Sequence, residues 1–178
     1  MALDTYVVLA NQYATESDAL ADYEAVRKLY TDAGLIDTYD AAVLTRKPNG
    51  KVDIVKRTEE PTRQIAAKGL IVGLAVGTVV ALFPAAGIGL ASGAFGGGAI
   101  GAGVGAIAGH VAGGISRSDL KDLGELLDNG TSGLLVVART DVEAKVNAAI
   151  TRAKKHARAK LQADTDALKR EIEGMRAA

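Results

Sequence analysis

The chain lacks cysteine and tryptophan, and its aromatic residues are limited to 5 Tyr and 2 Phe among 178 residues. Without cysteine there are no disulfides, thiolate metal sites or cysteine nucleophiles, which fits a reducing compartment. An aromatic content of 4% leaves only a thin interfacial belt for a membrane protein. Lys and Arg total 21, as do Asp and Glu, so overall charge does not indicate a nucleic-acid partner.

The N-terminus, MALDTYVVLANQ, has neither a basic region nor a long apolar core. These two features define a secretory signal peptide. The sequence therefore predicts that the chain starts as folded structure.

One long segment lacks charge altogether. Residues 69–116 contain no Asp, Glu, Lys or Arg, and 15 of these 48 residues are glycine. Every fourth residue is small, and positions four apart share one face of a helix, so a second backbone can approach closely along that face. The pattern is a glycine zipper, and it predicts a helix-packing and oligomerisation surface formed by Gly69, Gly73, Gly77, Gly89, Gly93, Gly97, Gly101, Gly105, Gly109 and Gly113, with Ala81 and Ala85 in the same register.

The length of this segment predicts a helical hairpin. About 20 helical residues cross a bilayer core of about 30 Å, so 48 residues allow two crossings and a turn. Pro84 ends or kinks the first arm. A buried helical pair in a soluble homo-oligomer and a disordered linker are the alternatives, and the many Leu, Ile and Val residues argue against a linker.

The residues before the zipper predict β-α-β-β. Thr5 to Ala10 is a short run typical of a buried strand, and a helix follows from a cap at Thr15 or Ser17 to Gly34. Residues 35–46 and 52–57 are predicted strands. The intervening Lys-Pro-Asn-Gly-Lys turn carries a strong hairpin signal because Asn-Gly tolerates positive φ.

The residues after the zipper predict α-β. Ser118 is the predicted cap of a leucine-rich helix that stops at Asn129-Gly130, and residues 131–139 form a fourth strand. The fold class is therefore α+β, a ferredoxin-like βαββαβ domain with the zipper hairpin inserted after its third strand. The chain divides into 1–62 and 117–139, which form this domain, 63–116, which is the hairpin, and 140–178.

The last of these segments is predicted to be one long helix. Thr140 and Glu143 match a capping box, and apolar residues recur at a mean spacing near 3.67 as far as about Met175. Its middle is basic. A solvated face, contact with anionic lipid headgroups and nucleic-acid binding are the alternatives for Arg152, Lys154, Lys155, Arg158 and Lys160.

No catalytic, metal or cofactor site is predicted. Gly101 to Ala106 fits the loose dinucleotide pattern G-x-G-x-x-G/A, but it lies inside the four-residue repeat rather than after a strand. His110 is the only ionisable group inside the zipper, where a headgroup-level or pore-lining role is open. His156 lies among basic residues, so the two histidines offer no metal-ligand spacing.

The chain resembles an uncharacterised bacterial family described as membrane proteins of unknown function. The features that carry the resemblance are the VVLA strand, the hairpin DAAVLTRKPNGKVDIVKR, the zipper and LKDLGELLDNGTSGLLVVA, which together span residues 5–139. The resemblance implies a small α/β domain interrupted by a glycine- and alanine-rich apolar segment. It brings no catalytic residues with it.

Together these features predict a non-enzymatic, homo-oligomeric bacterial protein whose partners are itself and membrane lipid, with no nucleic acid and no identified small-molecule substrate. Basic residues flank the zipper on both sides, which places the α/β domain in the cytoplasm and the hairpin in the inner membrane by the positive-inside rule. A structural or pore-like assembly follows from this reading. The alternative is a soluble cytoplasmic particle or filament whose zipper interior holds lipid or another apolar cargo.

Overall fold

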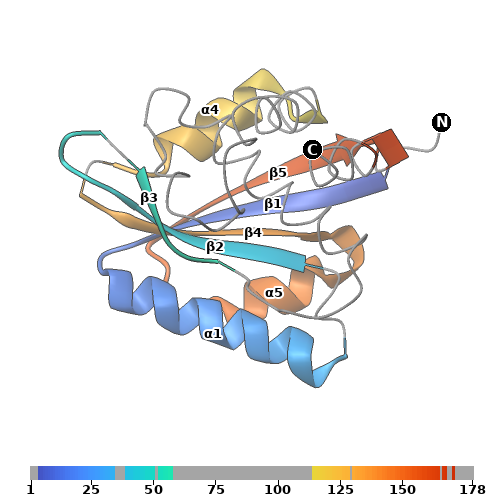
Figure 1. Cartoon of the computed structure of the whole chain (residues 1–178), viewed down its shortest axis with the longest axis horizontal. Coiled ribbons are helices and arrows are strands. Elements are labelled where there is room, and N and C mark those ends of the chain that lie inside the picture. The colour runs from blue at the N-terminus through green and yellow to red at the C-terminus, as the bar shows by residue number, and fades with distance from the viewer. Residues whose placement is uncertain are drawn as a thin grey trace.

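The computed structural model describes residues 4–34, 39–50, 52–57, 114–128, 130–164, 166–167 and 170. They form a mixed helix and strand fold with a five-stranded antiparallel sheet and three helices (Figure 1). In chain order the elements are β1 (Asp4–Tyr13), α1 (Glu16–Asp32), β2 (Tyr39–Arg46), β3 (Val52–Arg57), α4 (Arg117–Glu125), β4 (Ser132–Arg139), the 3₁₀ turn η2 (Thr140–Val142), α5 (Glu143–Ala149) and β5 (Lys155–Ala163).

The strand order is β3-β2-β4-β1-β5, and every neighbouring pair is antiparallel. β1 and β4 lie in the interior of the sheet and read as continuous apolar runs, TYVVLA and LLVVA. Such runs are typical of strands covered on both faces. The pairing of β2 with β3 shifts register between Val43 and Leu44, which indicates a bulge near that edge of the sheet.

Each face of the sheet has its own apolar core. On one face α1 and α5 cover Val7 and Leu9 of β1, with Val26 of α1 and Val146 of α5 fully buried. On the other face α4 covers the alternate residues, so that Leu123 packs with Val8. Figure 1 shows this three-layer arrangement, with α4 on one side of the sheet and α1 and α5 on the other.

Several predicted elements are confirmed. Strands occupy residues 4–13, 39–46, 52–57 and 132–139, and the first helix begins after Thr15, whose side chain accepts a hydrogen bond from the Asp18 amide. The predicted hairpin turn is present. Gly50 has a φ of +84° and its amide donates to the Lys47 carbonyl at 2.9 Å.

The predicted long C-terminal helix is wrong. α5 ends at Ala149 because Ile150 turns to extended backbone, and β5 follows within six residues. The apolar pattern with a mean spacing near 3.67 counted Ala157 and Leu161. It left out Ala159, which lies between them and also faces the core. Apolar residues at alternate positions with His, Arg and Lys in between give a period of two, and the edge of β1 supplies the backbone partners for that strand.

Two predicted helix caps are also wrong. Ser116, not Ser118, caps α4 by accepting from the Asp119 amide at 3.1 Å. Thr140 opens a 3₁₀ turn whose start has no side-chain cap, and Glu143 binds Arg158 of β5 rather than closing a capping box. The partner of Glu143 comes from a strand 15 residues away, which a local motif cannot anticipate.

Candidate functional site

The described residues on either side of 58–113, the range that contains most of the uncharged segment, lie at one end of the sheet. β3 finishes at Arg57, which pairs with Ala42 in the first half of β2. Gly114 contacts Leu161 and Gln162, which lie near the end of β5 where its pairing with β1 stops. The pairs Tyr39 with Ala138 and Tyr6 with Arg139 lie at this same end. Arg57 and Gly114, the described residues on either side of 58–113, therefore lie at the same end of the sheet.

The two attachment points lie at opposite edges of that end, because β3 and β5 are the outermost strands. Four strand intervals separate them, which at about 4.8 Å each give roughly 19 Å.

The return point is closely packed. A Cβ built on Gly114 would lie 2.1 Å from the backbone oxygen of Gln162 and 2.7 Å from a methyl group of Leu161. The next residue, Ile115, is 4% exposed and belongs to the core beneath α4. Glycine is required here because the chain passes directly over the backbone of β5.

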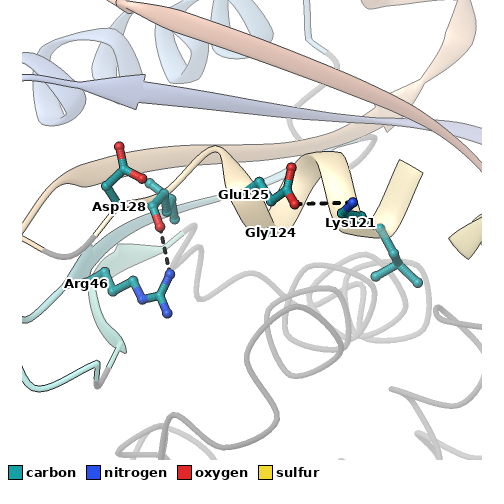
Figure 2. A pocket seen from close by; sticks show the side chains of 7 residues that line it. Arg46, Lys121, Gly124, Glu125 and Asp128 are labelled. Carbon is teal, nitrogen blue, oxygen red and sulfur yellow. Dashed lines mark hydrogen bonds and ion pairs between the residues drawn. The ribbon is translucent and has the colours of Figure 1, made fainter. Parts of the chain in front are cut away.

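A pocket of about 540 Å³ lies beside the C-terminal end of α4, at the opposite end of β2 from Tyr39 (Figure 2). Its lining carries two cations and two carboxylates among apolar and glycine positions, namely Arg46, Leu120, Lys121, Gly124, Glu125, Leu127 and Asp128. The arrangement offers charge of both signs to a polar ligand.

Protein contacts already engage most of this lining. Arg46 donates through Nη1 to the Leu127 carbonyl at 2.8 Å, as Figure 2 shows. Asp128 accepts from the Gln12 amide group at 3.3 Å, and Lys121 lies 3.6 Å from Glu125 one helical turn away. Arg46 thus satisfies a carbonyl just past the helix end, where cations are favoured. We interpret the pocket primarily as the packed junction between α4 and β2.

The basic residues predicted to contact lipid headgroups are spread along the length of β5, and carboxylates of α1 and α5 bind two of them. Arg152 precedes β5 and binds Asp18 and Asp22 of α1. Arg158 binds Glu143. Lys155 pairs with Gln12 at the end of the sheet opposite to Gly114. It lies eight residues along β5 from Ala163, a distance of roughly 26 Å.

Lys154 also lies at that far end, where its amide donates to the Gln12 carbonyl at 2.7 Å. Lys160 pairs with Val7 nearer the end where the segment attaches. Of the five predicted residues, Lys160 is therefore the nearest along β5 to the attachment points. The ten zipper glycines, from Gly69 to Gly113, and His110 lie outside the described residues.

The sequence analysis missed a buried polar network around Asp22. The Asp22 side chain is fully buried, and its carboxylate accepts from the Tyr13 hydroxyl at 3.0 Å and from the Arg152 amide at 2.9 Å. The Arg152 guanidinium lies 3.5 Å from the other oxygen. Burial beside a carboxylate raises the pKa of Tyr13. The available signal was that Asp22 falls three residues after Ala19 and four before Val26, on the apolar stripe of α1.

Within the described ranges no group of three or more His, Cys, Asp or Glu side chains is placed to hold a metal ion. In the same part of the chain no helix combines the length and apolar character needed to cross a bilayer.

Comparison with known proteins identifies a family. The family model described as a protein of unknown function (DUF1269) matches residues 66–173, which is more than half of the chain. Neither the curated proteins nor the solved structures give a match. The matched range contains the uncharged segment together with α4, β4, α5 and all of β5. The chain therefore belongs to the DUF1269 family of proteins of unknown function.

Proposed function

We propose that this protein is a non-enzymatic, homo-oligomeric, membrane-associated protein that assembles through its glycine zipper. The observation that carries the proposal is the attachment of residues 58–113 at one end of the sheet, by Arg57 on one side and Gly114 on the other. A hairpin that enters and leaves a bilayer on one side needs a domain with this property.

The proposal includes the ferredoxin-like arrangement, with a changed assignment of its elements. β4 lies between β1 and β2, and β5 lies on the outer side of β1. The order β2-β4-β1-β5 with α1 and α5 on one face matches the split βαβ pattern if β5 is its last strand and α5 its second helix. β3 and α4 are then additions, and the uncharged segment is inserted between them.

The composition of the segment supports close helix packing. Small residues at every fourth position permit backbones to approach, and in lipid such contacts rather than apolar burial hold helices together. Exposed Arg117 and Lys121 stand in α4 directly after the segment. Cations here suit anionic headgroups on the cytoplasmic side. Heterologous contacts between identical hairpins would close into a ring, which supports a structural or pore-like assembly.

Fractionation of cells that express the full-length chain tests the membrane location. We expect the protein in the membrane pellet after a high-salt wash and its release by detergent. Recovery without detergent, as a large uniform particle in the soluble fraction, would reject the bilayer location and favour a soluble assembly with an apolar interior.

A pair of double variants tests the zipper. Replacing Gly101 and Gly105 by Leu fills the small face, so the native mass in detergent should fall to that of a monomer or small oligomer. Replacing Ala102 and Ala106 by Leu places the same side chains at the same spacing on another face and should leave the mass unchanged. Equal effects from both variants would contradict the assignment of the packing face. Circular dichroism of the α/β domain checks that it stays folded.

A further inference from the structure

The outer edge of β5 presents backbone groups that the described strands do not use. β5 and β1 pair over nine residues without a register shift, from the pair of Lys155 with Gln12 to the pair of Ala163 with Asp4. Among the described strands, β5 lies at the edge of the sheet. Regular edges of this length are templates for another strand unless they are bent or covered. β3, at the other edge, has the bulge that β5 lacks.

The hydrogen-bond register shows which residues of β5 face outward. In an antiparallel ladder both backbone groups of a residue point to one neighbour, and the next residue points to the other. The Arg46 amide donates to the Thr131 carbonyl at 3.0 Å, so odd-numbered residues of β4 bond β2 and even-numbered ones bond β1. The same alternation applies to the pairing of β4 with β1 and of β1 with β5. The odd-numbered residues of β5 are therefore hydrogen-bonded to β1.

The even residues of β5 therefore point their amides and carbonyls away from the sheet. Two contacts agree with this assignment. The Gln12 carbonyl, on an even residue of β1, accepts from Lys154 next to β5, and the outward carbonyl of Gln162 is the one that Gly114 approaches. Gly114 covers the end of the edge, so the stretch that no described residue covers consists of His156, Arg158 and Lys160.

The same three residues carry cationic or ionisable side chains on one face. Each is exposed, and they lie on the side of the sheet covered by α5, where Arg158 is bound to Glu143. His156 contacts Asn11 at 2.7 Å, and Lys160 makes no ion pair with any described residue. An added strand would therefore place alternate side chains beside a basic row in which Arg158 already binds Glu143 and Lys160 has no carboxylate partner among the described residues.

This charge disfavours pairing with a second copy. If two β5 strands met around a two-fold axis at Arg158, that residue would face its own symmetry mate and Lys160 would face His156. Like charges directly opposite each other destabilise an antiparallel pair. The same row attracts carboxylates.

We propose that the outer edge of β5 binds an extended peptide segment of another protein by strand addition, and that this segment carries Asp or Glu at alternate positions. The outward backbone groups of His156, Arg158 and Lys160 supply the main-chain hydrogen bonds, and their side chains select acidic partners. This interaction goes beyond the proposed assembly through the zipper and uses a different surface.

A short fluorescent peptide in which Glu and Val alternate is the probe, and one in which Lys and Val alternate is its control. The full-length chain should bind the first peptide and not the second, with binding that weakens as salt rises. Hydrogen exchange should show new protection at the amides of Arg158 and Lys160. The amides of Ala157 and Ala159 should not change, because they already bond β1.

Variants at Lys160 separate charge from backbone. Lys160→Pro removes one outward backbone amide and should weaken binding of the Glu-Val peptide at least about tenfold. Lys160→Gln keeps the backbone amide and should weaken binding of the Glu-Val peptide less than Lys160→Pro does. Lys160→Glu should reverse the preference, so that the Lys-Val peptide binds better. Lys28→Gln, on exposed α1, is the matched control and should have no effect.

Failure of the Glu-Val peptide to bind, equal binding of both peptides, or protection outside residues 156–160 would each overturn the proposal. Protection of these amides by dimer formation without peptide would identify a second copy as the occupant and overturn it as well. If Lys160→Pro fails to fold, the reversal expected for Lys160→Glu decides the outcome.

Discussion

Gly114 lies against the backbone carbonyl of Gln162, where a Cβ on residue 114 would be 2.1 Å from the oxygen. Alanine normally stabilises a helical position relative to glycine by about 1 kcal/mol. At this site overpacking, typically about 1–3 kcal/mol, opposes that gain because a backbone atom cannot rotate away. Gly114→Ala should therefore lower the free energy of unfolding by about 1–2 kcal/mol in denaturant titration.

Gly133→Ala is the comparison for this variant. Its Cβ would lie 2.6 Å from a terminal methyl of Leu127, which is a flexible side chain, although Asn11 contributes a backbone oxygen at 3.3 Å. We expect a smaller loss, about 1 kcal/mol or less. A Gly114→Ala protein as stable as the wild type would show that the close approach at the return point is absent in solution.

The buried Asp22 carboxylate holds α1 to the loop before β5. Asp22→Ala removes the acceptor for the Tyr13 hydroxyl and the Arg152 amide and leaves both donors without it. A buried donor left without an acceptor costs about 1–3 kcal/mol, measured as the free energy of unfolding, so the loss of both hydrogen bonds should cost at least that much. Asp32→Asn, at an exposed pair with Lys28, should cost less than about 0.5 kcal/mol. Similar losses from both changes would mean that the network contributes no more than a surface pair.

The parts of the fold that sequence predicted have strong local signals. Strand β4 reads as an unbroken apolar run, the first helix has a cap at Thr15, and the turn at Gly50 has the Asn-Gly sequence. Each of these signals lies within a few residues of the structure it specifies. The order of the described elements up to Arg139 therefore followed from the sequence, while the inserted hairpin lies outside the described residues.

The parts that failed depend on contacts between distant residues. β5 has helix-compatible spacing when only Ala157 and Leu161 are counted, and it becomes a strand because nine residues of β1 are available beside it. Likewise Glu143 fits a capping box locally, but Arg158 competes for its carboxylate. The outward edge of β5 could not be predicted at all, since it follows from registers across three strand pairs.

The pairing of Glu143 with Arg158 predicts a pH dependence. The hydrogen bond from Arg158 lowers the pKa of Glu143 below its usual 4.5. A carboxyl with a lowered folded pKa adds stability that is complete above its ordinary pKa and is lost as the pH falls through the folded value. Glu143→Gln should therefore be less stable than wild type by about 0.5–1 kcal/mol at pH 7, and the difference should shrink as the pH falls below 4.5 through the lowered pKa of Glu143.

Denaturant titrations of both proteins across this pH range measure that difference. Glu125→Gln is the control, because its partner Lys121 lies 3.6 Å away on an exposed surface and the change should have little effect at any pH. A constant difference between Glu143→Gln and wild type from pH 7 to pH 3 would exclude the charge pair as its cause.

Two buried tyrosines should respond oppositely to loss of the hydroxyl. Tyr13 donates to Asp22 at 3.0 Å, whereas the buried hydroxyl of Tyr30 has no hydrogen-bond partner within the described part of the chain. Tyr13→Phe leaves a carboxylate short of a donor and should cost about 1.5–3 kcal/mol of unfolding free energy. Tyr30→Phe keeps the stacked ring against Tyr39 at a centroid distance of 3.9 Å and removes an unsatisfied group, so its stability should stay equal or rise by up to about 1 kcal/mol. A loss of more than about 1 kcal/mol in Tyr30→Phe would show that its hydroxyl is hydrogen-bonded in solution.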